Sequence, residues 1–395
     1  MQYRALATRI GAKIGAKRRT LILLVAIAPL AFLLFFVGER CILIAKSVCI
    51  LYSGPRDQPL PVRMATAFFS GPVTIRDFQL PGSAGPIRTR IFAPSNRPDA
   101  PMVVVVPGMT PHGVDDPHLM ALGNRMAAFG FQVVAPEIAS QRHFLMRRDA
   151  LATIGDAVLW AAAKQGRPVP LYGFSFSGGL VLAAASQPAY AQHVSLVFCV
   201  SGYNDLPRLG NYYIRNIEVA PDGSGTNLPP FYTGRLLIAM QHMDEIVPLS
   251  EVDLMQRLTE DALELRPDFQ QRDLAPLPPD QRNLFLDVEY ARTATIRHNL
   301  YQLMKTHAVE FVAISPRAQL AGIKAPVYLL HGPVDDVTPL AEAEWNVQDM
   351  PKGVPLHYFV SRWMGHAAVG PPASIWTRLE LGNYVASVLS ASGMH

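Results

Sequence analysis

The serine at position 175 stands in a glycine-rich segment whose spacing suits a nucleophile. Residues 173–179 read Gly-Phe-Ser-Phe-Ser-Gly-Gly and follow a short apolar run. Small residues two places before and after a serine allow a tight strand-to-helix turn that exposes its hydroxyl at the edge of a sheet. The trailing position here is Ser177 instead of glycine, so a turn centred on Ser177 is an alternative, and a serine that only caps a helix is another. The spacing favours Ser175, because Gly173 then closes the strand side.

A serine hydroxyl is a poor nucleophile at neutral pH and needs a base, which an acid in turn orients. Candidates for both follow later in the chain. An apolar run over 327–330 leads to the adjacent Asp335 and Asp336, and a second run leads to Gly365-His366. His366 stands out among eleven histidines by this position alone. The chain order serine, acid, histidine, with each residue after a successive strand, predicts nucleophilic acyl chemistry.

The elements that must position these residues alternate between two kinds. Short β-branched runs and segments of helical period follow one another from about residue 72, which predicts an α/β fold with a mostly parallel sheet wrapped by helices. The predicted strands are residues 73–80, 87–92, 102–106, 131–135, 169–172, 194–200, 327–330 and 356–360. The predicted helices are residues 119–129, 147–164, 177–187 and 373–389.

The alternation stops for more than a hundred residues before the seventh strand. Helical periods over 251–265 and 287–305 are joined by proline-rich segments there. A structureless loop of this length is implausible in a compact domain, so we expect a helical insertion over residues 203–324. The sheet domain is then residues 72–202 and 325–395.

The N-terminal part of the chain has its own composition. Residues 1–19 carry six lysines and arginines and no acid, and subtracting them from the net charge of +4 leaves −2 for the rest. A basic surface that could bind nucleic acid is therefore not expected on the body of the protein. Residues 21–37 are uninterruptedly apolar, with Pro29 inside.

This layout predicts a transmembrane anchor over residues 20–38, at the short end of the range that spans a bilayer. The run ends Gly-Glu-Arg-Cys, which offers no small-residue cleavage site. The basic tail would stay cytoplasmic, giving a single-pass protein with its body on the extracytoplasmic side. Residues 39–71 would form a juxtamembrane segment and a proline-rich linker. A short apolar stretch over 41–52 carries Lys46 and would extend the anchor or dock on the body.

Cofactor chemistry has no support in the residues. The three cysteines, Cys41, Cys49 and Cys199, form neither a C-x-x-C pair nor a metal-spaced cluster with histidine, and no nucleotide motif is present. Cys199 lies in an apolar run, where we expect a buried structural thiol. We expect neither a metal nor a cofactor.

From about residue 102 to the last helix, outside the insertion, the chain resembles the α/β-hydrolases. The family's acid stands three residues after the glycine of a strand-end motif closing with Val-x-Pro, which matches Asp335 and leaves Asp336 as the competitor. The Gly-His pair at His366 is similar to the family's histidine signature, and His331 matches a structural histidine. The resemblance implies an oxyanion hole made by the backbone N–H groups of Phe176 and Met109.

The resemblance implies a serine hydrolase that cleaves carboxylic esters, with the insertion where the family keeps its lid. The anchor and the lid position suggest an amphipathic or lipid-like substrate. The alternatives are acyl transfer or thioester or amide hydrolysis by the same serine, and a catalytically inactive binding protein of the membrane surface, for which Ser177 is the one favourable feature. The sequence does not predict an oligomeric state.

Overall fold

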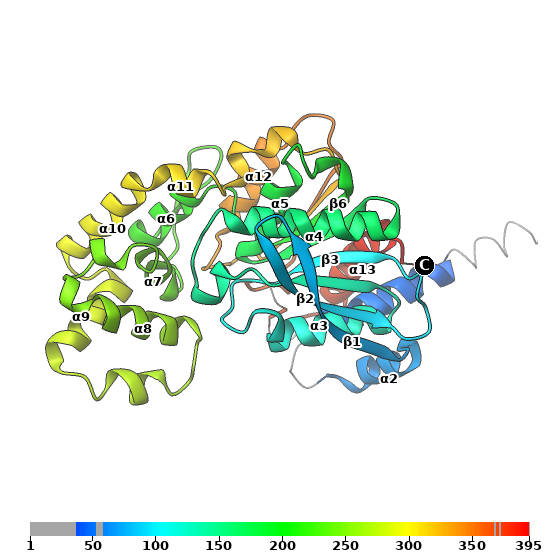
Figure 1. Ribbon diagram of the computed structural model, residues 1–395, viewed down its shortest axis with the longest axis horizontal. Coiled ribbons are helices and arrows are strands. Elements are labelled where there is room, and N and C mark those ends of the chain that lie inside the picture. Colours follow the sequence, from blue (N-terminus) through cyan, green and yellow to red (C-terminus); the bar gives the residue numbers. More distant parts are fainter. Residues whose placement is uncertain (1–36, 53–57, 367–368, 371–372, 395) are drawn as a thin grey trace, which may run out of the picture.

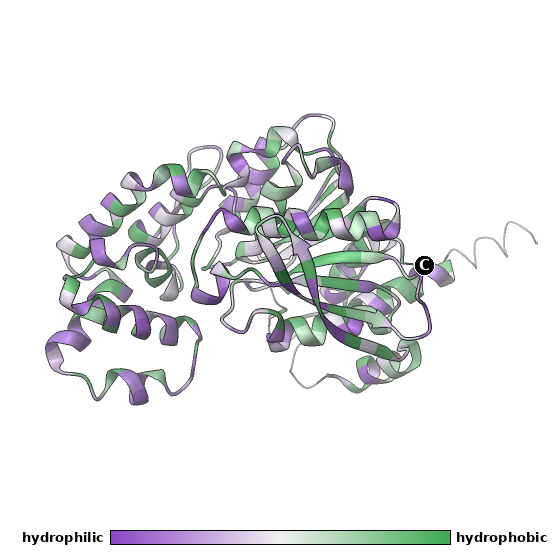
Figure 2. Cartoon of the chain, in the orientation of Figure 1, coloured by the Kyte–Doolittle hydropathy of each residue, from purple (hydrophilic) through white to green (hydrophobic). Residues whose placement is uncertain are grey.

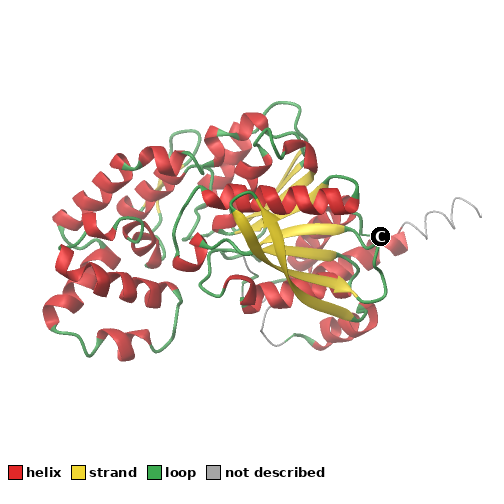
Figure 3. Ribbon diagram, viewed as in Figure 1, coloured by secondary structure: helices red, strands yellow, loops and turns green. Residues whose placement is uncertain are grey.

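The computed structural model describes residues 37–52, 58–366, 369–370 and 373–394. An eight-stranded sheet in the order β1-β2-β4-β3-β5-β6-β9-β10 forms its centre. Within this sheet the strands β4, β3, β5, β6, β9 and β10 run parallel, while β2 is antiparallel to both of its neighbours, β1 and β4. The predicted α/β class with a mostly parallel sheet flanked by helices is confirmed (Figure 3).

Each predicted strand is present, three of them with the predicted bounds and four of them longer than predicted. The strands are β1 (Val73–Gly82), β2 (Gly85–Pro94), β3 (Met102–Val106), β4 (Gln132–Pro136), β5 (Val169–Phe174), β6 (Val194–Val200), β9 (Val327–His331) and β10 (Leu356–Val360). The central strands β3, β4 and β9 are buried at every residue, as expected where helices cover both faces. Strand β3 is mostly green in Figure 2, the colour of hydrophobic residues.

Two hydrophobic layers lie on the two faces of the sheet. Side chains alternate along a strand, so Val104 and Val106 of β3 enter one layer while Val103 and Val105 enter the other. The first layer packs against α4 (Asp149–Gln165), α5 (Phe176–Ala185) and α12 (Leu340–Asp349). The second packs against α3 (Pro117–Ala128) and α13 (Ile375–Ala391). Figure 1 shows α4 and α5 above the strands and α3 below them.

The chain between β6 and β9 is mainly helical, and we call residues 203–324 the insertion. It lies to the left of the sheet in Figure 1. Its helices are α6 (Leu206–Arg215), α7 (Thr233–Ala239), α8 (Val252–Leu263), α9 (Pro279–Tyr290), α10 (Ala294–Thr306) and α11 (Ala308–Val312), with a small hairpin of β7 (Ile217–Val219) and β8 (Gly225–Asn227).

The prediction of one helix inside the insertion is wrong. The single helix expected over residues 287–305 is two helices, α9 and α10, with a sharp turn between them. Ala291 adopts a left-handed conformation (φ 47°), which ends α9, and the Thr293 side chain then accepts the backbone N–H of Ile296 at the start of α10. Hydrophobic periodicity continues across the turn because both helices bury a face in the same layer.

The described chain begins with a helix over residues 37–51 that docks on the body. Leu43, Cys49 and Ile50 are buried in the second hydrophobic layer. The Arg40 guanidinium donates to Asn383 and Ser387 of α13, which fastens this helix to the last helix of the chain. The apolar stretch over 41–52 is therefore a docked helix, one of the two roles considered for it.

The predicted single-pass membrane localisation is corrected. Within the described ranges, no helix has both the length and the apolar character needed to cross a bilayer. Most of the predicted anchor, residues 20–36, and the basic tail lie outside the described residues. The apolar side of the helix over 37–51 packs against the protein, so the described end of the predicted anchor is buried by the protein itself.

The segment predicted as a linker is also partly wrong. Residues 53–57 lie outside the described part, but α2 (Leu60–Phe69) begins directly afterwards. Pro59 stands at its N-cap and Pro61 in its first turn, a position where proline favours a helix because its missing N–H is not needed there. The prolines that suggested a linker therefore start a helix.

Candidate active site

Ser175 lies on a sharp turn between strand β5 and helix α5. Its backbone has φ 54° and ψ −131°, a conformation that L-residues rarely adopt and that costs energy. The turn is tight enough that a Cβ on Gly173 would lie 2.4 Å from the Ser177 carbonyl oxygen, so only glycine fits there. The turn has the geometry of a nucleophile elbow, with the serine hydroxyl presented at the carboxyl edge of the sheet.

Ser177, the alternative centre of the motif, is fully buried in the first turn of α5. Its hydroxyl accepts a hydrogen bond from the Gln141 side-chain amide at 3.0 Å. A serine can therefore replace the usual glycine at position 177, because Gln141 bonds its buried hydroxyl. A Cβ on the next residue, Gly178, would lie 2.8 Å from Gly202 Cα, which explains why glycine follows at once.

Three side chains from separate loops converge at this edge. Ser175 Oγ lies 2.6 Å from His366 Nε2, and His366 Nδ1 lies 2.9 Å from both carboxylate oxygens of Asp335. The serine follows β5, the aspartate follows β9 and the histidine follows β10. An imidazole placed in this way can take the hydroxyl proton on one nitrogen while the carboxylate holds the other N–H, which fixes the tautomer.

Asp335 is buried and held as an anion. Burial by itself would raise its pKa, but His366, His331 and the backbone N–H of Thr338 together keep the pKa of Asp335 below its usual value. His331 is buried as well, with its Nε2 2.8 Å from the Thr338 carbonyl oxygen, and burial lowers its pKa. His331 therefore supports the acid loop through its contacts with Thr338 and Asp335.

Asp336, the competing acid, is held through its backbone. Its carbonyl oxygen accepts the Tyr212 hydroxyl at 2.9 Å and the backbone N–H of Phe231 at 2.9 Å. The Tyr213 hydroxyl donates to the carbonyl of the next residue, Val337, at 2.7 Å. Two neighbouring tyrosines of α6 thus fasten the insertion to the acid loop, a role that the sequence analysis did not assign to them.

The histidine loop is also held by residues that the sequence analysis missed. Trp363, three residues before His366, is buried and packs on Tyr52 at the end of the helix over 37–51, with ring centroids 5.2 Å apart. A Cβ on Gly332 would lie 2.5 Å from the Met364 carbonyl oxygen, so the acid and histidine loops touch. Aromatic residues near a predicted catalytic histidine were the only signal, and they are common elsewhere.

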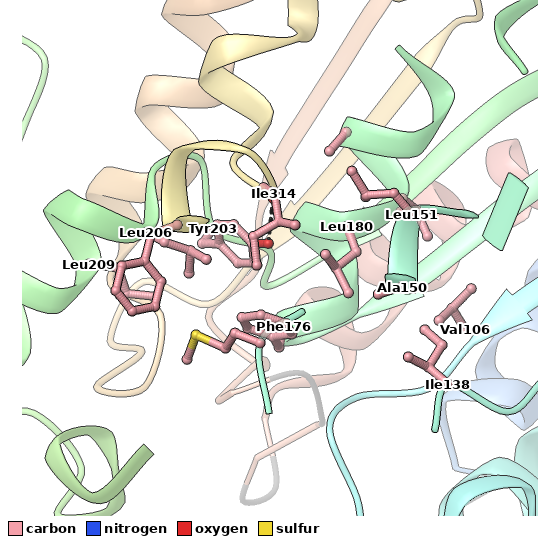
Figure 4. Packing of buried hydrophobic residues seen from close by; sticks show 14 of the residues in the cluster. Val106, Ile138, Ala150, Leu151, Phe176, Leu180, Tyr203, Leu206, Leu209 and Ile314 are labelled. Carbon is pink, nitrogen blue, oxygen red and sulfur yellow. Dashed lines mark hydrogen bonds between the residues drawn. The ribbon is translucent and has the colours of Figure 1, made fainter. Parts of the chain in front are cut away.

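The loop after β3 passes close to the serine. A Cβ on Gly108 would lie 3.3 Å from Ser175 Cβ and 3.8 Å from its Oγ. Met109, the next residue, borders the same cavity as Ser175. Phe176 opens α5, where a backbone N–H has no intrahelical acceptor, and its ring packs on Tyr203 with centroids 5.0 Å apart (Figure 4). Their roles as oxyanion donors stay predictions.

Charged residues brace this loop from outside. Asp115 pairs with Arg88 at 2.9 Å and with Arg90 at 2.8 Å. Asp116 caps α3 by accepting the backbone N–H groups of His118 and Leu119. Both aspartates therefore hold the loop and the following helix in place.

A cavity of about 770 Å³ has Ser175 and His366 in its wall. Its volume is typical of pockets that bind small organic ligands. Apolar side chains from the insertion and from both hydrophobic layers form most of the remaining lining.

One cluster in the described residues has the composition of a metal site. His242, Glu245 and His307 of the insertion bring potential ligand atoms within 4.8 Å of one another. The two imidazoles, however, stack face to face, with centroids 3.5 Å apart and planes 13° apart. Nitrogen lone pairs lie in the ring plane, so two stacked rings cannot both point at one ion. His307 instead bonds Glu245 and Glu310, at 2.7 and 3.0 Å.

The comparisons with known proteins found similar solved structures only. No family model matches the chain, and no curated protein does. An acylaminoacyl peptidase of Pyrococcus horikoshii is 12% identical with a TM-score of 0.46, over 81% of this chain and 42% of the peptidase. A Pyrobaculum calidifontis esterase is 15% identical with a TM-score of 0.45, over 89% and 92%.

A putative dienelactone hydrolase from Klebsiella pneumoniae is 13% identical with a TM-score of 0.45, over 82% of this chain and 100% of that one. The chain spans about two fifths of the length of the acylaminoacyl peptidases, 41 to 42%. None of these TM-scores reaches 0.5, so these similarities do not establish a family for the chain, and its function is inferred from its own topology and site geometry.

Proposed function

Taking the chain as a member of the α/β-hydrolase superfamily, which its sheet, its elbow and the order of its serine, aspartate and histidine indicate, we propose that it is a serine hydrolase that cleaves carboxylic esters. The observation that carries the proposal is the continuous contact Ser175–His366–Asp335, at 2.6 and 2.9 Å. The buried anionic acid supports the orienting role that it has in the proposal.

The reaction has two steps, acylation of Ser175 and hydrolysis of the acyl-enzyme. Ser175 Oγ bonds to the ester carbonyl carbon while its proton moves to His366 Nε2, and the tetrahedral intermediate collapses as that proton passes to the leaving alkoxide, which departs as an alcohol. In the second step a water oxygen bonds to the acyl carbon while one water proton moves to His366 Nε2. The bond between the acyl carbon and Ser175 Oγ then breaks as that proton passes to Oγ, which releases a carboxylic acid and restores the serine. The amides of Met109 and Phe176 would hold the oxyanion, at about 3 kcal/mol each.

We include a lid role for the insertion in this proposal. Its residues Leu209, Leu237 and Leu263 border the cavity that contains Ser175. Its helix α6 is bonded to the acid loop through Tyr212 and Tyr213. A cover of this kind excludes water from the site and shapes the space for the substrate. The division at residues 203–324 is part of the same proposal.

Labelling with a fluorophosphonate tests the proposal directly, because this probe bonds only to an activated serine. We expect the purified full chain to be labelled and to hydrolyse p-nitrophenyl acetate, and Ser175→Ala to lose both. Ser177→Ala is the matched control and should keep labelling, since its hydroxyl bonds Gln141. A folded wild-type protein that remains unlabelled would show that the serine is not activated and that the chain is no serine hydrolase.

A further inference from the structure

The cavity at Ser175 extends to both sides of the serine. On one side it runs among insertion residues such as Leu237 and Leu263. On the other side it enters the second hydrophobic layer, between the sheet on one wall and α3, α13 and the helix over 37–51 on the other. We call this second part the under-sheet branch and define it by Ile50, Leu122, Tyr172, Phe198, Val385 and Val388.

The under-sheet branch is lined by apolar surface. Phe198, Val385 and Val388 are almost completely buried and carry no polar side-chain atoms. The one hydroxyl in the defined set, that of Tyr172, is already paired with Ser392 at 2.6 Å. A hydrocarbon ligand in this branch therefore gains free energy because its own apolar surface leaves water, and it finds no free polar partner among these residues.

The insertion side differs in chemistry. Thr233 of the insertion and Thr338 of the acid loop bring hydroxyl groups to the cavity there, beside the leucines, whereas the Tyr213 hydroxyl already donates to the Val337 carbonyl. An ester cleaved at Ser175 has two parts, an acyl chain and an alcohol whose oxygen takes up a proton as it leaves. The side with hydroxyl groups suits the alcohol part, and the closed apolar side suits an unbranched hydrocarbon chain.

We infer that the under-sheet branch binds the acyl chain of a long-chain acyl ester, and that the helix over 37–51 closes its far end and sets the chain length accepted. The inference rests on the proposed ester hydrolysis and adds the substrate class. Ile50 lies at the C-terminal end of that helix and borders the branch together with Val385 and Val388 of α13.

The helix is seated firmly enough to act as an end wall. A Cβ on Gly382 of α13 would lie 2.8 Å from Val48 Cγ2 and 3.5 Å from Ile44 Cγ2, which shows how closely the two helices pack. Arg40 bonds Asn383 and Ser387 of the same helix. A segment that precedes the sheet domain in sequence is thus part of the substrate pocket.

The test is a series of p-nitrophenyl esters from acetyl to palmitoyl, hydrolysed by the full chain. We expect kcat/KM to rise with chain length, by up to about fourfold per methylene, until the chain reaches the helix. Val388→Trp fills the branch and should move the optimum to shorter chains, because kcat/KM for the palmitoyl ester falls more than kcat/KM for the acetyl ester. Leu263→Trp adds similar bulk on the insertion side and should leave the optimum unchanged.

A second variant guards against misfolding of the first. Ile50→Ala shortens the end wall and should move the optimum to longer chains. A wild-type rate that is flat or falls with chain length would overturn the inference, as would an optimum that moves with Leu263→Trp and not with Val388→Trp. Those outcomes leave fluorophosphonate labelling and acetyl ester hydrolysis intact, so they are distinct from a failure of the proposed function, in which both are absent.

Discussion

The surroundings of Gly173 leave no room for a side chain. It ends the strand side of the elbow, where an added Cβ would lie 2.4 Å from the Ser177 carbonyl oxygen and 2.6 Å from Val181 Cγ2. Because one of these atoms belongs to the backbone of α5, relief requires a shift of the helix that carries the turn. The position of Ser175 relative to His366 therefore depends on glycine at residue 173.

We expect Gly173→Ala to destabilise the fold by about 1–3 kcal/mol and to lower kcat/KM for an acetyl ester more than tenfold, since the hydroxyl is displaced from the imidazole. Thermal unfolding and steady-state hydrolysis measure the two effects. Gly38→Ala is the control, because a Cβ there meets nothing within 4 Å and alanine is the better helix former. Full activity in a stable Gly173→Ala protein would contradict this account of the elbow.

At the residue scale, the sequence pattern predicted Ser175 and His366 and left two aspartates as candidates for the acid, of which the family resemblance favoured Asp335, the one that the structure places beside His366. Parallel strands end at one edge of the sheet, so polar residues that follow successive strands must lie near one another. Tyr52 and Trp363 could not be predicted in the same way. Their contact depends on how a helix from the start of the chain docks beside a loop from its end, and no local pattern encodes that placement.

Helix α6 connects the insertion to the acid loop. Tyr213 donates to the Val337 carbonyl, and Tyr212 donates to the Asp336 carbonyl. The two bonds are not equivalent, because the Asp336 carbonyl also accepts the backbone N–H of Phe231. Without the Tyr212 hydroxyl, the Asp336 carbonyl keeps the Phe231 N–H as a partner. Without the Tyr213 hydroxyl, the Val337 carbonyl loses its bond to the insertion.

We therefore expect Tyr213→Phe to cost about 1–2 kcal/mol of stability and Tyr212→Phe clearly less. If α6 also positions Asp335, kcat should fall several-fold in Tyr213→Phe with little change in KM, a separation that a general loss of stability does not produce. Chemical denaturation and full kinetics at saturating substrate measure both. Equal effects of the two substitutions would contradict the asymmetry.

At the element scale, strands were easier to predict than the helices of the insertion. A buried strand is a short run with clear ends, whereas α9 and α10 share one hydrophobic layer and differ only by the left-handed turn at Ala291. The helix over 37–51 shows the other difficulty. Its apolar residues suit a membrane or a protein surface equally well in sequence, and only the partner helix α13 decides between them.

At the scale of the whole molecule, unsatisfied polar groups gather in the insertion. In the part of the chain that the structure describes, five buried side-chain nitrogen and oxygen atoms lack a hydrogen-bond partner. They belong to Arg235, His242, Thr259, Arg266 and Glu289. Each such atom costs free energy, so the insertion should open locally at a lower free energy than the sheet and α5.

Glu289 gives this difference a pH dependence. Burial raises its pKa from 4.5 to about 7. In the opened insertion the carboxyl titrates near 4.5, so between pH 4.5 and 7 the closed form binds more protons than the open one. The stability of the closed form is therefore highest below pH 4.5, falls as the pH rises through this window, and stays low above pH 7.

We expect the opening free energy of α9 amides, from hydrogen exchange corrected for intrinsic rates, to fall by about 1–3 kcal/mol between pH 5 and pH 8. Amides of α5 serve as the internal control. Burial lowers the pKa of His242, whereas Glu245 and Glu310 raise the pKa of His307 against its burial. The share of Glu289 is therefore measured as the difference between wild type and Glu289→Gln. Glutamine cannot ionise and should flatten the profile and raise protection at pH 8, and an unchanged profile would mean that Glu289 does not control the opening.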